Sequence, residues 1–257
     1  MTLFKAISDG TPLVGTFIKT PHHVVVEALG GSGLDFVILD AEHSTFGIAE
    51  IDRCLLAART VRMPALVRLT EGRPADILRV LDMGADGFLV PHVVSAAQAR
   101  AVVAAARYGA GGRGYSATNR AGNYGRTPMA QHLENAKDVA AILQIEDPEG
   151  VDNIAEIAAV PGVAACFIGR ADLAVAYGAN ELSAPEVERA AETVMAACKA
   201  NALPVVTFVP RMEDARAWFE RGATVIAVAS EHEPMQDYFS RSAIDDAKRR
   251  NADLDAG

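Results

Sequence analysis

Short apolar runs recur along the chain, and a longer segment with helical spacing follows most of them. The runs are nearly continuous in Val, Ile, Leu and Phe, which is typical of strands that are buried on both faces of a parallel sheet. We predict eight strands within residues 12–19, 35–43, 64–70, 87–93, 140–147, 164–172, 204–210 and 224–230.

The segments between these runs predict helices. Apolar residues recur at three-to-four spacing, with Ser, Asp or Pro near the start, in residues 47–61, 73–85, 95–109 and 183–202. Alternation of strand and helix implies parallel strands joined by crossovers, and eight such units in 257 residues match the usual length of a (β/α)₈ barrel. We therefore predict an α/β protein with one TIM-barrel domain over residues 1–257 and a flexible tail at about 248–257.

An open, doubly wound sheet is the alternative architecture. No G-x-G-x-x-G motif follows the first strand, and the glycine-rich residues 30–33 precede a strand, where they fit the end of a helix. The closed barrel is therefore favoured.

The interval between the fourth and fifth strands is the longest and contains a loop, residues 107–128, that is rich in Gly, Asn and Arg. A loop of this length is either a disordered flap or has a function. Arg113, Arg120 and Arg126 suit anionic groups of a substrate better than they suit an idle linker, so we favour a function for residues 109–128.

Charge and cysteine content narrow the class of partner. A formal net charge of −9 and a pI near 5.2 oppose binding to nucleic acid or to anionic membranes. Cys54, Cys166 and Cys198 are far apart and lack metal-type spacing, which indicates reduced, buried thiols. Lys5 and Asp9 interrupt any signal-peptide core, and no apolar run is long enough to span a membrane. We expect a soluble, cytoplasmic protein that acts on a small molecule.

Polar side chains gather where the predicted strands end. In a TIM barrel the active site is built at the carboxyl ends of the strands, so position along each run separates functional from structural residues. The residues at these ends are Asp40, Glu42 and His43 on strand 2, Arg68 on strand 3, Pro91 and His92 on strand 4, Gln144, Glu146 and Asp147 on strand 5, and Arg170 and Asp172 on strand 6.

Two of these acids predict a metal site. Gln144 and Glu146 are two residues apart and share one face of their strand, which can be the barrel interior. A charged Glu146 is costly there, and Asp172 on the next strand increases the cost unless a divalent cation binds both. Oxygen ligands without cysteine favour Mg²⁺ or Mn²⁺ over Zn²⁺. The alternative is that each acid caps a helix or pairs with a cation.

Arg68 and His43 are candidates for charge stabilisation and proton transfer. Arg68 either pairs with a carboxylate or stabilises the negative charge of an enolate, and both roles are compatible. His43 can carry a proton near neutral pH. Asp82 is a candidate for orienting the His43 ring, while Asp40 and Glu42 are alternatives for that role.

The motifs DFVILDAEH, VRLTEG, VLDMGADGFLVPHV, RYGAGGRG, LQIEDPEGVDNI and VAACFIGRADLAVAYG, in this order and over nearly the whole chain, resemble the HpcH/HpaI-type, class II (metal-dependent) pyruvate aldolases. That family includes 4-hydroxy-2-oxoheptanedioate and 2-keto-3-deoxy sugar-acid aldolases. The resemblance implies a lyase that reversibly cleaves a 4-hydroxy-2-oxo acid to pyruvate and an aldehyde through a metal-bound pyruvate enolate.

The resemblance also implies roles for individual residues and an assembly. Glu146 and Asp172 would hold Mg²⁺, Mn²⁺ or another divalent cation, and the substrate would lie against Arg68, Gln144, Gly169 and Asp172. Arg68 would bind the pyruvate oxygen, and His43, oriented by Asp82, would serve acid–base chemistry. The chain would form a homo-oligomer, a trimer or a hexamer.

Two departures from the family pattern bear on specificity. This chain reads GRADL where many members have proline, which puts Arg170 beside Asp172, and its loop reads GYSATNRAGNYG in place of S-x-x-A-R-A. Three other functions are the alternatives: a lyase acting on coenzyme A thioesters, a Schiff-base aldolase using Lys19, and a non-catalytic barrel that binds a keto acid.

Overall fold

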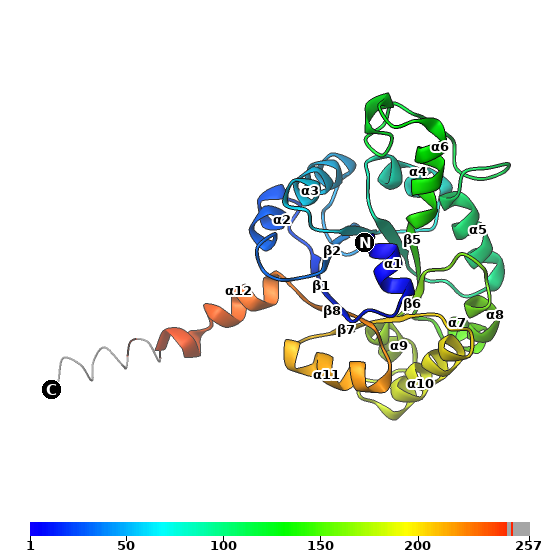
Figure 1. The fold of residues 1–257 in the computed structure, drawn as a ribbon. Helices are drawn as coiled ribbons and strands as arrows, with labels where there is room; N and C mark the ends of the chain where they lie inside the picture. Colours follow the sequence, from blue (N-terminus) through cyan, green and yellow to red (C-terminus); the bar gives the residue numbers. More distant parts are fainter. Residues whose placement is uncertain (246–247, 249–257) are drawn as a thin grey trace.

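The computed structural model describes residues 1–245 and 248. Its core is a closed parallel barrel in which each strand pairs with the next along the chain and the last pairs with the first (Figure 1). The strands of this part of the chain are β1 Leu13–Ile18, β2 Phe36–Asp40, β3 Ala65–Arg68, β4 Gly87–Val90, β5 Ala140–Ile145, β6 Ala165–Ile168, β7 Val205–Val209 and β8 Val225–Ser230. The predicted (β/α)₈ barrel is confirmed.

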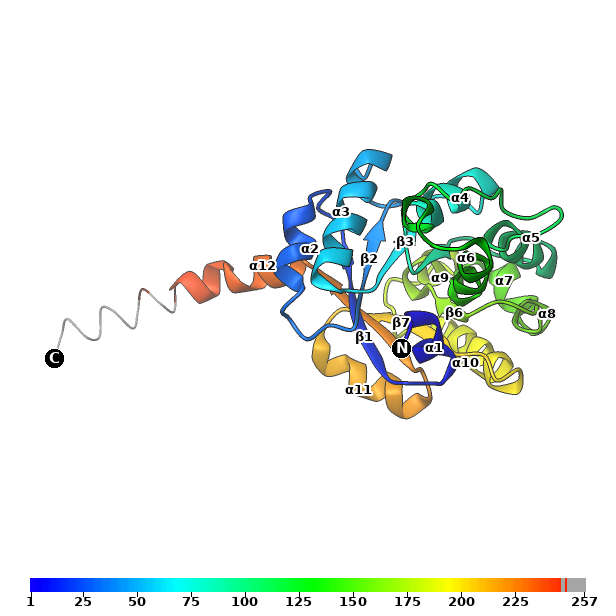
Figure 2. The same ribbon diagram turned by 45° about the horizontal axis from the view of Figure 1, so that its top comes forward.

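Helices surround the barrel, as the two views in Figures 1 and 2 show. They are α1 Leu3–Ser8, α2 His23–Leu29, α3 Ile48–Val61, α4 Pro74–Asp82, α5 Ala96–Ala106, α6 Met129–Asn135, α7 Pro148–Asp152, α8 Ile154–Ala158, α9 Arg170–Ala176, α10 Pro185–Ala200, α11 Met212–Arg221 and α12 His232–Tyr238, with short 3₁₀ turns η1 Asn123–Gly125 and η2 Ala136–Asp138. The four predicted helices correspond to α3, α4, α5 and α10. Gly30 caps α2, which confirms the helix end predicted there.

One predicted strand is too long. Residues 164–172 were expected to be extended, but β6 ends at Ile168 and α9 begins at Arg170. The backbone turns at Gly169, with φ −86° and ψ 74°. Asp172 therefore lies in the first turn of a helix that follows the strand.

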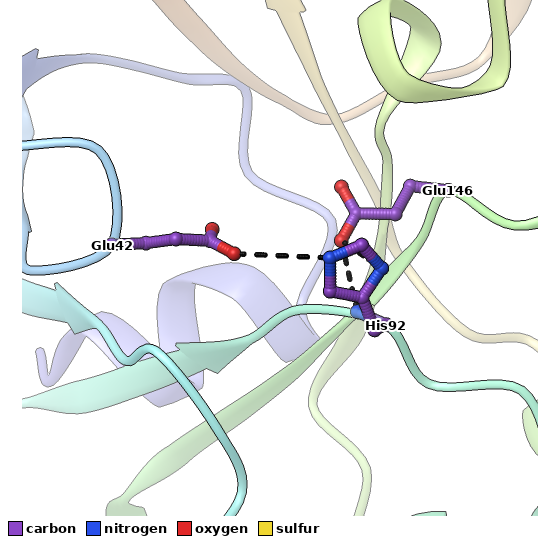
Figure 3. A group of neighbouring side chains, drawn as sticks. All are labelled: Glu42, His92 and Glu146. Atoms are coloured by element: carbon purple, nitrogen blue, oxygen red, sulfur yellow. Dashed lines mark hydrogen bonds and ion pairs between the residues drawn. The ribbon is translucent and has the colours of Figure 1, made fainter. Parts of the chain in front are cut away.

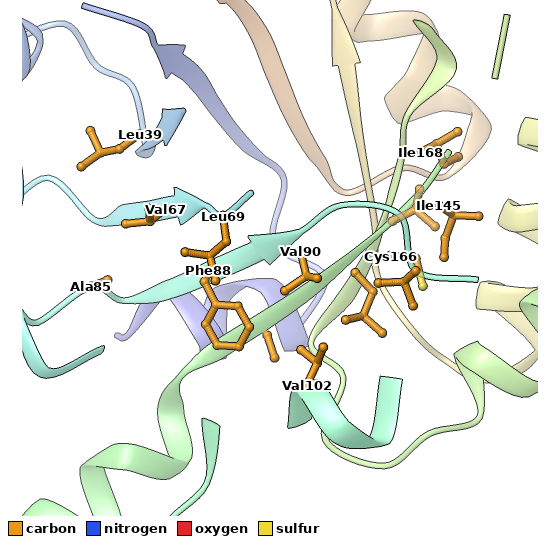
Figure 4. Packing of buried hydrophobic residues seen from close by; sticks show 14 of the residues in the cluster. Leu39, Val67, Leu69, Ala85, Phe88, Val90, Val102, Ile145, Cys166 and Ile168 are labelled. Carbon is orange, nitrogen blue, oxygen red and sulfur yellow. The ribbon is translucent and has the colours of Figure 1, made fainter. Parts of the chain in front are cut away.

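Alternation along each strand separates two cores. Phe36, Ile38 and Leu66 belong to a cluster inside the barrel, whereas Leu39 and Val67 belong to the larger cluster between strands and helices. Part of that outer cluster is drawn in Figure 4. Because successive side chains of a strand point to opposite faces, every second residue of a strand faces the barrel interior.

The same alternation directs the polar residues at the strand ends inward. Asp40 continues the series of Phe36 and Ile38, and Arg68 follows Leu66 two residues later. Gln144 likewise continues the series of Ile142, which lies inside the barrel. The barrel therefore has an apolar interior towards its amino end and a polar interior at its carboxyl end.

Other expectations concern the cysteines, the tail and membranes. Cys54, Cys166 and Cys198 are buried free thiols, as predicted. The tail predicted for residues 248–257 lies outside the described residues except for residue 248. No helix among the described residues has the length and hydropathy of a membrane span.

Candidate functional site

Asp40 organises the turn that follows β2. Its side chain is fully buried, and one carboxylate oxygen accepts the backbone N–H groups of Glu42, at 3.2 Å, and His43, at 3.0 Å. Such a turn, closed by an aspartate side chain, is a common use of this residue. It fixes the direction in which the Glu42 and His43 side chains leave the strand.

Arg68 is bound to Asp40 through two hydrogen bonds. The guanidinium Nε and Nη2 donate to the two carboxylate oxygens at 3.0 and 2.7 Å, because the two residues are register partners on β2 and β3. Burial raises the pKa of Asp40, but the Arg68 hydrogen bond and charge outweigh burial and lower it. The carboxylate of Glu42 is also near, with Oε2 lying 3.4 Å from Arg68 Nε. The guanidinium carbon of Arg68 lies 4.8 Å from the centre of the Phe17 ring.

Glu146 is a buried carboxylate just beyond the end of β5, with only 2% of its surface exposed. One oxygen accepts the backbone N–H of His92 at 2.9 Å, and the other accepts a short hydrogen bond from the Gln144 amide. Burial raises the pKa of Glu146 to about 7; these two hydrogen bonds oppose that increase, and the charge of Asp172 adds to it. A carboxylate in this position gains from a nearby cation.

Gly169 leaves room for that carboxylate. A Cβ atom at position 169 would lie 2.6 Å from Glu146 Cβ and 2.8 Å from Glu146 Oε2. Any side chain at this position would therefore displace Glu146.

Most of the predicted site residues, but neither Glu146 nor Asp82, line one cavity of about 270 Å³ at the carboxyl end of the barrel. Phe17, Phe167, Phe208 and Leu182 supply apolar wall. The polar lining includes His43, Arg68, Gln144, Gly169 and Asp172, together with Lys19, Ser230 and Glu233. Five residues predicted for catalysis or substrate binding therefore line one space, which is large enough for a small organic acid.

Three potential ligands for a cation converge beside this cavity. Glu42, His92 and Glu146 each have a ligand atom, and these atoms lie within 4.8 Å of one another (Figure 3). Buried oxygens of Glu42 and Gln144 have no hydrogen-bond partner. Burial raises the pKa of Glu42 despite the nearby charges of Arg68, His43 and His92. Oxygen-rich donors with raised pKa values and unpartnered atoms fit a divalent cation.

Asp82 lies apart from His43 in the described chain. It is the last residue of α4, and its carboxylate pairs with Arg113 of the long loop at 2.5 Å. His43 instead has Glu42 nearby, 3.8 Å from its Nε2. The orientation of His43 by Asp82 therefore stays a prediction.

Arg120 of the loop and Arg170 at the rim are also bound elsewhere, whereas Arg126 is exposed. Arg120 pairs with Asp52 at 2.8 Å, and neither it nor Arg113 lines the cavity. Arg170 does border the cavity, but its guanidinium stacks on Trp218 at 4.4 Å and donates to the Phe208 carbonyl at 2.7 Å. Its charge is therefore directed towards β7 and α11.

One pair of residues at the strand ends had no predicted partnership. His92 follows β4 and Asp147 follows β5, and His92 Nδ1 lies 3.0 Å from the Asp147 carboxylate. Partial burial lowers the pKa of His92, but the hydrogen bond to Asp147 and the charges of Glu146, Asp147 and Glu42 outweigh burial and raise it. The sequence did contain one indication of this pair, because both residues follow neighbouring strands at the same end of the barrel.

Comparison with known proteins gives relatives over most of the chain. Residues 13–236 match the family model for HpcH/HpaI aldolase/citrate lyase. A 5-keto-4-deoxy-D-glucarate aldolase of Klebsiella pneumoniae subsp. pneumoniae is 36% identical over 220 residues, covering 85% of this chain and 86% of that protein.

Solved structures extend the likeness to the whole fold. An HpcH/HpaI aldolase/citrate lyase family protein from Burkholderia cenocepacia J2315 matches with a TM-score of 0.90 and 29% identity, over 96% of this chain and 98% of that one. An HpcH/HpaI aldolase from Desulfitobacterium hafniense DCB-2 matches with a TM-score of 0.88 and 29% identity, over 94% and 95% of the two chains. The resemblance of the sequence motifs is thus confirmed, and the chain belongs to the HpcH/HpaI aldolase/citrate lyase family of lyases.

Proposed function

We propose that the protein is a class II pyruvate aldolase that reversibly cleaves a 4-hydroxy-2-oxo acid into pyruvate and an aldehyde, with Mg²⁺ or Mn²⁺ as cofactor. The observation that carries the proposal is the shared cavity, in which the guanidinium of Arg68 faces the same space as Gln144, Gly169 and Asp172. A guanidinium fixed in such a cavity can stabilise the negative charge of an enolate as it forms.

Glu146 and Asp172 are the proposed cation ligands. Glu146 is buried and has its pKa raised, in part by the charge of Asp172, so a cation between them removes an unfavourable arrangement. When bound, a divalent cation would polarise the carboxylate and ketone oxygens of the oxo acid. The side-chain amide oxygen of Gln144 is buried and has no hydrogen-bond partner. Gln144 lies two residues before Glu146 on the same strand face, and we propose that it contacts the keto acid.

Arg68 and His43 are proposed to handle charge and protons. In cleavage, His43, directly or through a water molecule, accepts the proton of the 4-hydroxyl group as the C3–C4 bond breaks and the aldehyde forms. The electron pair of that bond passes to the pyruvate part, giving an enolate whose oxygen lies against Arg68. Protonation of the enolate carbon then gives pyruvate. Asp40 holds Arg68 in place through its two hydrogen bonds.

The similarity to a 5-keto-4-deoxy-D-glucarate aldolase at 36% identity supports a substrate derived from a sugar acid. Such substrates bear hydroxyl groups and a second carboxylate beyond the bond that breaks. Lys19, Ser230 and Glu233 line the cavity and offer polar partners to these groups.

A coupled assay of pyruvate release over a panel of 4-hydroxy-2-oxo acids tests the proposal. We expect activity that disappears on exhaustive chelation and returns with Mg²⁺ or Mn²⁺. We expect Glu146→Gln and Asp172→Asn to lose most of the turnover, whereas Glu149→Gln, an exposed acid of α7, should keep it. Wild-type turnover in both site variants, or activity that survives chelation, would contradict the proposal.

The Schiff-base alternative predicts a different result. Lys19 borders the cavity, and its Nζ lies 3.5 Å from Asp40 Oδ2. Borohydride reduction in the presence of pyruvate would then attach a pyruvate-derived group to Lys19, with activity insensitive to chelation. Reaction with coenzyme A thioesters in the same assay panel separates the remaining lyase alternative, and keto-acid binding without turnover of any compound indicates the non-catalytic one.

We also propose that the chain assembles into a homo-oligomer, a trimer or a hexamer. Support comes from α12, which extends away from the barrel in Figures 1 and 2 and carries exposed Met235 and Tyr238, with Phe239 exposed just after it. A second copy of the chain is the proposed cover for these apolar side chains. Light scattering on the purified protein measures the state, and a monomer at micromolar concentration would contradict it.

A further inference from the structure

Backbone hydrogen bonds fix the position of His92 beside Glu146. Its N–H donates to Glu146 Oε1 at 2.9 Å, and the next residue, Val93, donates its N–H to the Gln144 carbonyl at 3.2 Å. His92 has a φ of +55°, in the left-handed region that side-chain-bearing residues seldom occupy. This turn places the imidazole ring beside Glu146, at the end of β4.

The Nδ1 edge of the ring faces two carboxylates, and the Nε2 edge faces a third. Nδ1 lies 3.0 Å from Asp147 Oδ2 and 3.4 Å from Glu146 Oε1, while Nε2 lies 4.0 Å from Glu42 Oε1. With the hydrogen on Nδ1 and donated to Asp147, Nε2 keeps its lone pair, and this nitrogen faces Glu42 (Figure 3). A histidine that binds a metal through one nitrogen usually donates its other N–H to a carboxylate in this way.

We propose that His92 supplies a nitrogen ligand to the divalent cation, so that Glu42, His92 and Glu146 form a mixed nitrogen and oxygen ligand set. The inference rests on the proposed metal-dependent function and adds Glu42 and His92 to the proposed ligands Glu146 and Asp172. The convergence of the three ligand atoms within 4.8 Å supports it. So does the side-chain amide oxygen of Gln144, which is buried and has no hydrogen-bond partner, in a residue that is 2% exposed.

A nitrogen ligand changes which ion the site prefers. Imidazole suits first-row transition metals, whereas Mg²⁺ takes oxygen ligands almost exclusively. The protein should therefore bind Mn²⁺ or Co²⁺ more tightly than Mg²⁺, and His92 should account for a large part of the difference. Asp147 acts as a positioning residue that holds the ring through Nδ1.

The competing explanation is an ion pair. A protonated His92 among Glu42, Glu146 and Asp147 satisfies the same distances without a metal bond. In that case removal of the ring would leave the order of metal affinities unchanged, and no nitrogen would be bonded to the ion.

Pulsed electron paramagnetic resonance of the Mn²⁺-loaded full-length protein distinguishes the two explanations. We expect ¹⁴N modulation from a directly bonded imidazole in the wild type and its loss in His92→Asn. Asparagine is the matched replacement, because it tolerates the left-handed backbone region better than most residues. His23→Asn, which changes another histidine of the chain, is the control and should retain the modulation. Absence of ¹⁴N modulation in the wild type, or its persistence in His92→Asn, would overturn the proposal.

Calorimetric titrations with Mn²⁺ and Mg²⁺ supply a second readout. His92→Asn should weaken Mn²⁺ binding by more than tenfold while changing Mg²⁺ binding little, and Asp147→Asn should weaken Mn²⁺ binding by about 10–100-fold. Equal losses for both ions in His92→Asn would overturn the nitrogen ligand. Failure of the proposed function is a different result: Mn²⁺ affinity would then be unaffected by Glu146→Gln, and pyruvate release would not require metal.

Discussion

The two ends of the barrel use aspartate in different ways. At the amino end, Asp35 and Asp86 precede β2 and β4. Each carboxylate accepts a backbone N–H at the start of the preceding strand, from Val14 at 2.8 Å and from Ala65 at 2.9 Å. At the carboxyl end, Asp40 binds the guanidinium of Arg68 as well as the backbone of its own turn. The acids at the amino end bind the backbone of the neighbouring strand. The acid at the carboxyl end also positions a charged side chain beside the cavity.

The two uses of aspartate separate contacts that stabilise the fold from contacts that position groups for chemistry. A carboxylate that binds backbone N–H groups has its hydrogen-bonding capacity used by the fold. Glu42 and Glu146, in contrast, have raised pKa values and lie close to unpartnered polar atoms. Burial also raises the pKa of Asp86 at the amino end, but that acid is bonded to the backbone. The carboxyl end instead brings two acids with raised pKa values close together, and such a group is typical of a functional site.

His43→Asn, at the carboxyl end, should lower turnover strongly without lowering stability. Loss of a general base typically lowers turnover by about 10²–10⁴-fold. The free energy of unfolding should stay unchanged, because 55% of the His43 side chain is exposed. Steady-state kinetics and urea unfolding measure the two quantities, and a stability loss as large as the activity loss would contradict this division.

Phe36→Ala should have the reverse effect at the amino end. Phe36 is fully buried inside the barrel, and a Cβ atom on Gly15 would lie only 2.5 Å from its ring. We expect a loss of about 3–5 kcal/mol in the free energy of unfolding. Turnover per folded molecule at low temperature should remain near that of the wild type. A loss of kcat in the folded molecules would show that the amino end also affects the chemistry.

Arg68→Lys tests a residue that serves both purposes. Lysine keeps the charge but lacks the planar fork that binds two carboxylate oxygens, so turnover should fall by about 10²–10³-fold. Stability should fall less than in Arg68→Met, which removes the buried guanidinium from Asp40 and leaves the Lys19 ammonium, 3.5 Å away, as the nearby cation. Arg53→Lys, on an exposed pair with Glu50 at 3.0 Å, is the control and should change stability by less than about 0.5 kcal/mol.

Asp86→Asn should give the smallest effect, visible as a change in pH dependence. Burial raises the pKa of Asp86 above its ordinary value of 3.8, and the backbone hydrogen bond from Ala65 only partly opposes this. The folded protein then binds more protons than the unfolded chain between the two pKa values, so this group lowers stability as pH rises through that window. In Asp86→Asn the stability lost on raising the pH through this window should be smaller than in wild type, as measured by urea unfolding at a series of pH values. An identical dependence in both proteins would show that Asp86 has no such role.

The sequence predicted the barrel, the gathering of polar residues at the carboxyl ends of its strands, and a shared face for Gln144 and Glu146 that can be the interior. Strand alternation alone places Asp40, Arg68 and Gln144 in the interior, because each follows an apolar interior residue at a spacing of two. The family motifs then pointed to Glu146 and Asp172. The partnership of Asp40 with Arg68 was left among several alternatives, because the pairing register of β2 and β3 cannot be read from either strand by itself.

Two features depended on information that the sequence does not contain. The position of the His92 ring follows from a left-handed backbone turn at a residue other than glycine, which no local preference indicates. The pairing of Asp82 with Arg113 depends on the path of the loop over residues 107–128, whose glycine-rich composition is compatible with many paths. Strand patterns repeat regularly and are therefore predictable, whereas single turns and long loops are decided by contacts distant in the chain.

The register between β2 and β3 links folding to activity through Asp40 and Arg68. These residues are direct partners across the two strands, so a slip by one position would turn the guanidinium towards the helices and leave a lone carboxylate in the barrel. An incorrectly aligned barrel is thus penalised electrostatically, in addition to its poorer packing. The residue pair therefore favours the correct strand alignment. A chain that closes correctly also places Arg68 in the cavity, where we propose that it binds the enolate.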